Sequence, residues 1–355
     1  GTRKRVGLVN IQGNTKSQDR VIRREVPMQP GEFYNSVDLE TTKRRLKNLG
    51  YFQDVQVTGA ASSQEGYRDV NILVQEQRTG TINFGLGFSS IDSILGRINL
   101  EQSNFDITNW GRFTGAGQRF SVNLQVGSQR TDFRVSLVEP WFLGQKLSLG
   151  TDLYYRDLIF LSPEYDQTNV GASVFLRKPV GRRSYIKGEY RVETIEIEAE
   201  NDTSQVFKDE EDKYLRSALS LNYVYDSRDS NRLPRRGHKV DLGLIYAGGL
   251  LAGDVDTITF TGSGTKHWSL PFDTILTARG SFAVVDSHGG DDNLPIFERQ
   301  FLGGARDLRG FQFRDIGPRD ATGPNATQEV LGGATSVFGS LEFTFPVIGQ
   351  VRGAV

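Results

Sequence analysis

The chain has 355 residues, carries a formal net charge of −1 and contains no cysteine. The charge balance gives no sign of bulk nucleic-acid binding, and the absence of thiols excludes disulfides, thiolate metal sites and cysteine nucleophiles. The 40 glycines, together with 22 Phe and 12 Tyr, favour β structure with many turns.

The chain starts at Gly1 rather than Met, so we expect a processed form or a fragment. It contains no apolar run of about eighteen residues, so no transmembrane helix is expected. The mean hydropathy of −0.41 suits a soluble protein, but it also suits a transmembrane barrel, whose lipid-facing and lumen-facing residues alternate. His238, His267 and His288 lack ligand spacing, and we interpret them as surface or loop residues without a metal.

Residues 1–78 show the pattern of a small α+β domain. Thr15 or Ser17 can cap a helix that extends to Glu25, and Ser36 is a suitable N-cap for the helix after it. The expected order is strand, helix, helix, strand, strand, with strands at residues 6–11, 52–57 and 70–74 and the second helix at 37–48.

From Thr81 onward, strand follows strand and no helix is expected. Apolar side chains alternate with polar ones or glycine, in segments of roughly 9–12 residues that can cross a bilayer when tilted. We count about twelve such segments up to Phe345. A soluble sandwich also alternates, but it does not need an apolar outside and a charged inside. Short turns at 140–144, 179–183 and 270–273 alternate with longer polar connections at 157–167, 196–212 and 286–336, as in an outer-membrane barrel.

The first of these strands combines apolar alternation with two glycines. Glycine inside a strand weakens its packing and pairing. Gly85 and Gly87 therefore either loosen the pairing of this strand or relieve crowding in a curved sheet. The residues of this strand are Thr81, Ile82, Asn83, Phe84, Gly85, Leu86, Gly87 and Phe88.

A turn motif follows a strand later in the chain. Asp side chains stabilise tight turns, and Pro and Gly interrupt regular structure. We favour a structural role, because the motif has no pocket and no histidine or metal partner that would support catalysis. Its residues are Asp226, Arg228, Asp229, Pro234 and Gly237.

The connection 286–336 is longer than a hairpin needs, and such loops are usually either functional or disordered. Its embedded apolar residues argue against disorder. In the strand at 338–345, a period of two places Glu342 on the polar face. An isolated carboxylate there needs a cation or water, so Arg309 can pair with Glu342 if the loop folds inward. The loop segment of interest is Leu308, Arg309, Gly310 and Phe311.

The loop segment, the turn motif and the strand around Glu342 together resemble the BamA superfamily of outer-membrane barrels, which insert or translocate other proteins. Residues 48–57 are similar to the helix-to-strand junction of a POTRA (polypeptide-transport-associated) domain. The resemblance implies a mainly β fold, with an α+β POTRA domain at 1–78 and an antiparallel transmembrane β-barrel at 79–355. The family barrel has sixteen strands and about twelve are present, so we expect either further strands after Val355 or closure of the barrel by another chain. We also expect further POTRA domains before Gly1.

The resemblance also assigns roles to residues. It implies that Arg309, with Leu308, Gly310 and Phe311, anchors the loop in the lumen against Glu342. It implies that the strand at 81–88 is one side of a lateral gate that templates an incoming strand. In the POTRA domain, the strand with Phe52, Val55 and Val57 is expected to pair with extended clients, although Phe52 is equally a core residue at a turn.

The function implied is that of an outer-membrane insertase, the central subunit of a barrel assembly machinery, rather than an enzyme. The implied partners are unfolded outer-membrane β-barrel clients, periplasmic chaperones, accessory assembly lipoproteins or subunits, and the lipid bilayer. No cofactor, metal or nucleic acid is expected. The implied location is the outer membrane of a diderm bacterium, with the POTRA domain in the periplasm, and an organelle outer membrane is less favoured.

Three other functions compete with this interpretation. A secretion or import transporter of the same superfamily would pass clients through the lumen, and the motifs alone do not separate it from an insertase. A passive diffusion porin would need neither a POTRA domain nor an inward arginine loop. An outer-membrane enzyme would need a nucleophile, base and acid in one place, and the sequence offers no such group.

Overall fold

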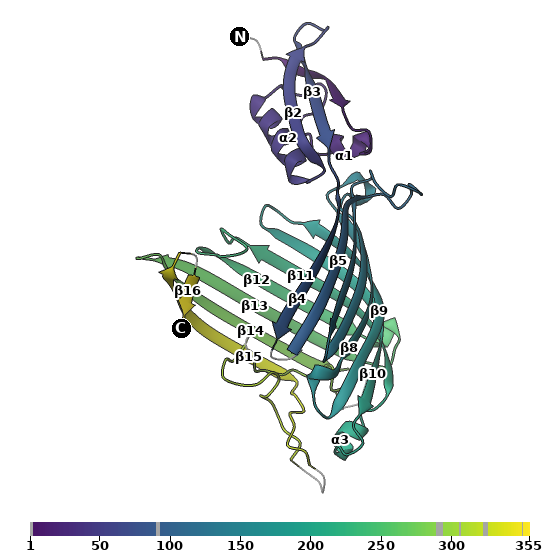
Figure 1. The fold of residues 1–355 in the computed structure, drawn as a ribbon, viewed down its shortest axis with the longest axis vertical. Helices are drawn as coiled ribbons and strands as arrows, with labels where there is room; N and C mark the ends of the chain where they lie inside the picture. The colour runs from purple at the N-terminus through teal and green to yellow at the C-terminus, as the bar shows by residue number, and fades with distance from the viewer. Residues whose placement is uncertain (1–2, 90–92, 289–293, 305–306, 322–325, 350) are drawn as a thin grey trace. The chain divides into compact units, whose positions relative to one another are not determined.

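The computed structural model describes residues 3–89, 93–288, 294–304, 307–321, 326–349 and 351–355 (Figure 1). Two sheets are present, one of three strands and one of thirteen. The chain divides into two compact units, and the three-stranded sheet belongs to the first. No helix in these ranges is long and apolar enough to span a membrane.

The N-terminal module has the predicted order of strand, helix, helix, strand, strand. Strand β1 (Arg5–Gln12) runs parallel to β3 (Tyr67–Glu76), and β3 runs antiparallel to β2 (Phe52–Ala61). The two helices, α1 (Asp19–Arg23) and α2 (Ser36–Asn48), connect β1 to β2. Because β3 lies in the middle, β1 and β2 are the edges of this small sheet.

The core of the module comes from the apolar positions of both helices and all three strands. Val21 and Ile22 of α1 and Leu46 of α2 are fully buried. They pack in one cluster with side chains of the sheet, including Val55 and Val70. Burial of this apolar surface stabilises the module, since each such side chain contributes about 1.5–3 kcal/mol.

The helix caps differ from the predicted ones. Asn35, not Ser36, caps α2, because its side chain accepts a hydrogen bond from the backbone N–H of Val37 at 3.0 Å. Gln18 precedes α1 and makes no capping bond. Thr15 and Ser17 instead bind Glu76 at the end of β3: the Thr15 hydroxyl donates at 3.0 Å and the Ser17 N–H at 2.6 Å.

The large sheet is antiparallel, and its strands follow one another in chain order from β4 to β16, so thirteen strands are described where about twelve were expected. Its strands are β4 (Gly80–Ser89), β5 (Ser93–Phe105), β6 (Gln118–Gly127), β7 (Arg130–Glu139), β8 (Ser148–Leu158), β9 (Tyr165–Pro179), β10 (Ser184–Ala199), β11 (Lys213–Asp226), β12 (Gly237–Ala247), β13 (Thr257–Leu270), β14 (Thr274–Ser287), β15 (Thr335–Ile348) and β16 (Val351–Ala354).

The two faces of this sheet differ in chemistry, as the alternation predicted. In β11, Leu219 and Leu221 are 51% and 55% exposed, whereas Arg216, on the opposite face of the strand, is only 9% exposed. In β8, the apolar Leu153 is 59% exposed and its neighbour Tyr154 is buried. An exposed apolar face opposite a charged face is the pattern of a sheet whose outside meets lipid.

The connections match the predicted alternation only in part. Loops 200–212 and 288–334 are long, and the turns 180–183 and 271–273 are short, as expected. However, residues 106–117 form a long connection on the short-turn side, and only Ser128 and Gln129 join β6 to β7 on the other side. The expectation of no helix after Thr81 was wrong, since loop 200–212 contains the short helix α3 (Gln205–Lys208).

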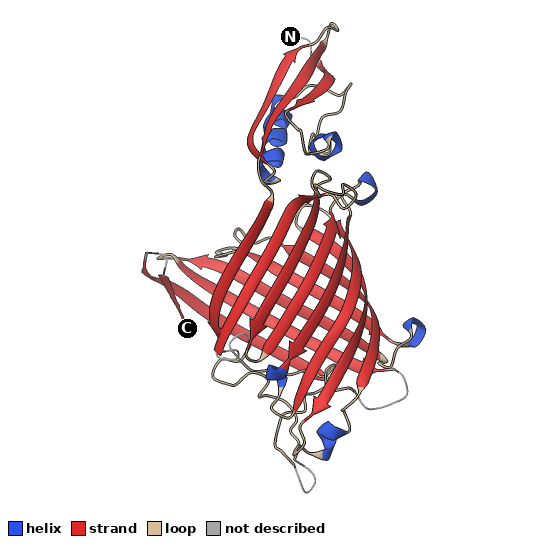
Figure 2. Ribbon diagram, turned by 45° about the vertical axis from the view of Figure 1, so that its right-hand side comes forward, coloured by secondary structure: helices blue, strands red, loops and turns tan. Residues whose placement is uncertain are grey.

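Among the described residues, three single 3-10 turns lie in other connections between strands. Figure 2 shows that the helical segments outside the module lie between strands rather than within them. The turns are η1 (Phe142–Gly144), η2 (Ile159–Leu161) and η3 (Gly249–Leu251).

The core of the N-terminal module yields a stability prediction. Leu46→Ala should leave a cavity and destabilise the module by about 2–5 kcal/mol. Hydrogen exchange of the β2 and β3 amides, measured in the whole chain, should report this as lost protection. The matched control is Val37→Ala on the same helix, because Val37 is 65% exposed and its truncation should leave exchange nearly unchanged. Equal exchange in the two variants would contradict the assignment of Leu46 to the core.

Candidate functional site

Strand β4 lies at one end of the strand order of the large sheet. Ile82, Phe84 and Leu86 alternate along it and are 59%, 77% and 87% exposed. Asn83 and Gly85 occupy the intervening positions. An edge strand presents a row of backbone N–H and C=O groups that another strand can pair with. Among the strands that the structure describes, the predicted first strand is thus an edge strand with an apolar face, and its role as a gate stays a prediction.

The arginine loop contacts the strand that follows it. Nη2 of Arg309 lies 2.5 Å from Oε2 of Glu342 on β15, so the two predicted residues are brought together. Nη2 of Arg279 on β14 lies 4.0 Å from the other Glu342 oxygen. Glu342 is paired in register with the buried Thr277, whereas its neighbour Leu341 is 73% exposed. Glu342 therefore lies on the polar face, as the period of two predicted.

The pair of Arg309 and Glu342 is only partly protected from solvent, since the two side chains are 61% and 17% exposed. Ion pairs of this kind stabilise by about 0–1 kcal/mol. Gly310 adopts a φ of +94°, which glycine tolerates, and Phe311 is exposed. Ala305 and Arg306 of the same segment lie outside the described residues.

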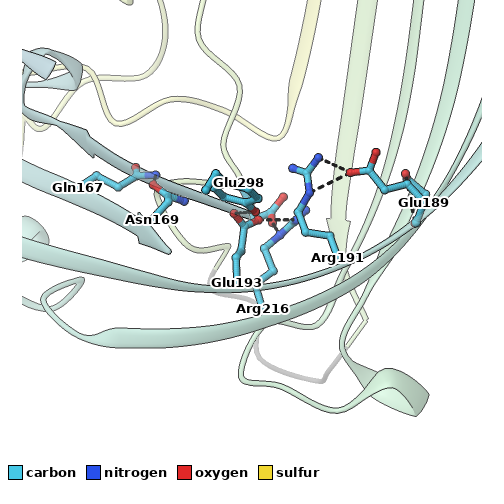
Figure 3. A network of polar contacts seen from close by, with 9 residues as sticks. Gln167, Asn169, Glu189, Arg191, Glu193, Arg216 and Glu298 are labelled. Atoms are coloured by element: carbon cyan, nitrogen blue, oxygen red, sulfur yellow. Dashed lines mark hydrogen bonds and ion pairs between the residues drawn. The ribbon is translucent and has the colours of Figure 1, made fainter. Parts of the chain in front are cut away.

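A second polar cluster connects the same loop to strands of the sheet and was not predicted from the sequence (Figure 3). Arg216 of β11 bridges two carboxylates: its Nη1 lies 3.2 Å from Oε1 of Glu193 on β10, and its Nε donates to Oε1 of Glu298 in loop 288–334. The hydroxyl of Tyr154 on β8 donates to the second oxygen of Glu193 at 2.7 Å. The side chains of Arg216, Glu193 and Glu298 are only 10%, 5% and 9% exposed.

Arg299, the residue after Glu298, connects this loop to loop 200–212. Nη2 of Arg299 lies 2.5 Å from Oε1 of Glu210 in loop 200–212, and Oε2 of Glu210 accepts the N–H of Ile296 at 3.1 Å. Nε of Arg299 donates to the carbonyl of Leu294 at 2.7 Å. Burial raises the pKa of Glu210, although Arg299 opposes this shift. Ile296 is itself buried in an apolar cluster with the aromatic ring of Phe207.

The predicted turn motif forms a compact network. The guanidinium of Arg228 donates to both oxygens of Asp226, at 2.9 and 2.7 Å. Asp229 accepts the N–H groups of Arg235 and Arg236 at 2.9 and 3.2 Å, and these bonds lower the pKa of Asp229.

Glycine is required at the end of this turn. Gly237 has a φ of +99°, and a Cβ there would lie 2.4 Å from the carbonyl oxygen of Ser227. Pro234 is partly buried between the exposed residues Leu233 and Arg235. Nη1 of Arg235 also lies 2.5 Å from Asp273 in the turn 271–273, which ties the two turns together. These contacts fit the structural role that the sequence favoured.

The residues predicted on the client edge of the POTRA domain lie in its core. Phe52 and Val55 are 5% and 0% exposed, and Val57 packs against the same cluster. Their strand, β2, is nevertheless an edge of the three-stranded sheet. Contact with a client at this position would therefore use the backbone of β2, not these side chains.

The histidines are hydrogen-bonded rather than clustered. His267 is only 7% exposed and its Nδ1 lies 2.9 Å from the Thr277 hydroxyl, so the interpretation of this residue as a surface group was wrong. His238 contacts the Ser227 hydroxyl and His288 the carbonyl of Ala247. Among the described residues, no group of three His, Cys, Asp or Glu side chains could hold a metal ion.

Comparison with known families agrees with this geometry. The model of the Omp85 superfamily domain matches residues 112–355, which is more than half of the chain. The chain belongs to the Omp85 superfamily. The POTRA model, described as a surface antigen variable number repeat, matches residues 4–77 of this Omp85 chain.

Relatives of this Omp85 chain include outer membrane protein assembly factors. The outer membrane protein assembly factor BamA of Nitratidesulfovibrio vulgaris is 27% identical over 341 residues, which cover 95% of this chain and 41% of the relative. The chain thus spans about four tenths of the length of that relative.

Solved structures show the same fold. BamA from Haemophilus ducreyi lacking POTRA domains 1–3 superposes with a TM-score of 0.85 at 21% identity, covering 100% of this chain and 71% of that one. CdiB from Acinetobacter baumannii gives a TM-score of 0.58 at 15% identity, covering 98% and 62%. The expected fold class, an α+β POTRA domain followed by an antiparallel β-barrel, is thereby confirmed.

The turn motif of this Omp85 chain yields a test of its structural role. Asp229→Ala should remove the acceptor of two backbone N–H groups, at a cost of about 1 kcal/mol each. The amides of Arg235 and Arg236 should then exchange several-fold faster. In the unmodified chain the same protection should be present above the ordinary Asp pKa of about 4 and be lost as the pH falls through the lowered pKa of Asp229. Ser220→Ala, in the body of β11, is the control, and unchanged turn amides in Asp229→Ala would refute the role.

Proposed function

We propose that this chain is part of an outer-membrane insertase, the central subunit of a barrel assembly machinery, which folds and inserts β-barrel proteins through a lateral gate. In this proposal residues 1–78 form the POTRA domain and residues 79–355 belong to the barrel. The protein is not an enzyme and needs no cofactor. It acts in the outer membrane of a diderm bacterium, with the POTRA domain in the periplasm.

The observation that carries the proposal is the edge strand β4. It combines an exposed apolar face with Gly85 and Gly87 at the alternate positions. Glycine weakens the pairing of a strand, so an edge built this way exchanges its partner at lower cost than a uniformly β-branched one. The likeness to the assembly factor BamA over nearly the whole chain supports the same function.

The mechanism follows from backbone pairing. Unpaired N–H and C=O groups are very costly in hydrocarbon, so a client strand that enters the membrane gains most by pairing at once with an edge such as β4. Backbone groups accept any client sequence, which suits a machine with many clients. Each step exchanges hydrogen bonds and breaks no covalent bond, so no nucleotide or catalytic residue is required.

The other predicted residues have supporting roles in this proposal. The loop of Leu308, Arg309, Gly310 and Phe311 occupies the lumen and contacts Glu342 on the second strand from the other end of the sheet. The edge of β2 guides unfolded clients delivered by periplasmic chaperones. Accessory lipoproteins or subunits complete the machinery.

A transporter that passes clients through the lumen is the main alternative, because POTRA domains and the arginine loop are compatible with both functions. A passive porin is disfavoured, because such a pore needs no POTRA domain, and residues 4–77 match the POTRA model. The two remaining functions differ in where the client goes: into the membrane through the seam, or across it through the lumen.

The proposal is tested by reconstituting the full-length protein in liposomes and following the folding of an added barrel client. The protein should accelerate client folding, because it supplies a paired edge at the membrane. A disulfide between a cysteine at Asn83 in β4 and one in the strand that closes the barrel against it should abolish the acceleration.

The chain has no natural cysteine, so each single-cysteine variant is a clean control and should retain activity. Full acceleration with the seam locked would rule out the lateral gate. Client or ion passage through the lumen without acceleration would instead move the assignment to a transporter.

A further inference from the structure

The arginine loop is held at two places that differ in their surroundings. One is the pair of Arg309 and Glu342 near the loop's middle. The other is the base of the loop, where Glu298 and Arg299 enter two adjoining ion pairs, with Arg216 of β11 and Glu210 of loop 200–212. The family motif indicates the first place as the anchor of the loop, whereas the burial of the charges indicates the second.

The contacts at the base extend through four consecutive strands. Tyr154 of β8 is paired in register with Gly171 of β9, Gly171 with Glu193 of β10, and Glu193 with Arg216 of β11. Only glycine fits in the middle of this row, because a Cβ at position 171 would lie 2.7 Å from the Tyr154 hydroxyl and 2.6 Å from Cβ of Glu193. Because Gly171 has no side chain, Tyr154 reaches across β9 to Glu193. Arg216 is therefore bound by strand residues through Glu193 as well as by the loop through Glu298.

The base also closes the loop on itself. The amide of Gln300 donates to the carbonyl of Gly333 at 2.7 Å and the amide of Gly333 donates back at 2.9 Å, which joins the two limbs of the loop. Nη1 of Arg299 reaches the carbonyl of Leu331 at 3.4 Å. Beside these contacts, Ile296 is 1% exposed in its apolar cluster. Displacement of Glu298 would therefore disturb both limbs together.

The two places differ in what their loss would leave behind. Removing Arg309, which is itself 61% exposed, leaves Glu342, which is 17% exposed, with Arg279 at 4.0 Å. Neutralising Glu298 leaves Arg216 with one carboxylate in a site where every partner is about nine-tenths buried. Loss of an ion pair that is shielded from water is more disruptive than loss of an exposed pair, because water cannot readily replace the charged partner that Nε of Arg216 would lose.

We propose that the buried cluster of Arg216, Glu193, Glu298 and Tyr154, rather than the exposed pair of Arg309 and Glu342, fixes the position of the arginine loop on the β10–β11 wall. Glu298 and Arg216 are then positioning residues for client insertion. That functional meaning rests on the proposed insertase activity, whereas the position of the loop does not.

Loop position can be measured without a client in the full-length protein. Residues 1–355 contain no cysteine, so once any cysteine elsewhere in the full-length protein is replaced by serine, spin labels can be placed uniquely at Glu198→Cys, on β10, and Gln312→Cys, beyond the motif; both positions are exposed. Double electron–electron resonance then gives the distance distribution between wall and loop. The unmodified pair should give one narrow peak. Glu298→Gln should lose that peak, and Arg309→Ala should keep it.

The matched control is Glu329→Gln, a neutralised carboxylate in the same loop outside the cluster, which should keep the narrow peak. Tyr154→Phe is a milder second variant, in case Glu298→Gln fails to fold; it removes only the hydroxyl that holds Glu193 and should broaden the peak. A narrow peak in both cluster variants, or a peak lost in Arg309→Ala as much as in the cluster variants, would overturn the proposal.

Client insertion in liposomes, measured on the same variants, separates the two claims. If Glu298→Gln broadens the peak and also slows insertion more than Arg309→Ala does, both the anchor and its positioning role hold. If the peak broadens while insertion by the unmodified protein is itself absent, the proposed function fails and the anchor stands. If the peak broadens and insertion is unchanged, Glu298 is not a positioning residue.

Discussion

The pairing of backbone hydrogen-bonding groups is the constraint on which the rest of this structure depends. Inside a membrane no water is present to satisfy N–H and C=O groups, so a spanning sheet must pair them strand to strand. From β5 to β15 each strand has a neighbour on both sides. Strands β4 and β16 stand at the two ends of this order in the part of the chain that the structure describes, and the proposed function uses the edge of β4.

The parts of the fold that the sequence predicted are those set by local periodicity. An apolar residue at every second position identifies strands such as β11 and places Glu342 on the polar face, because side chains alternate strictly along a strand. The module was predictable for the same reason, since Val21, Ile22 and Leu46 repeat on helical faces and are buried. The choice of Ser36 over Asn35 as a cap failed by one residue, because Ser and Asn are both favoured at the N-cap position and Asn35 is the one that accepts the N–H of Val37.

The contacts that hold the arginine loop could not be predicted in this way, because they join residues far apart in the chain. Arg216 and Glu298 are 82 positions apart. Periodicity does place Glu193 and Arg216 on the polar face of their strands, and this was a usable signal that both charges need partners there. Periodicity cannot predict the path of the loop. The sequence motif therefore pointed to Arg309 as the anchor, whereas the structure shows that Glu298 is the more buried of the two charges. The helix α3 was missed for a similar reason, since the apolar partners of Phe207, among them Tyr165, Ile197 and Ile296, are brought to it only in the folded chain.

The central claim, that the backbone of β4 recognises the client, is tested most directly by cysteine cross-linking between β4 and a client strand during insertion. Single cysteines would be placed in turn at Ile82, Asn83, Phe84 and Gly85, and paired with cysteines along the client's terminal strand. Backbone pairing predicts that disulfides form only between positions opposed in one antiparallel register, whatever the client's side chains. Cross-links scattered without register, or confined to lumenal positions of other strands, would contradict the account.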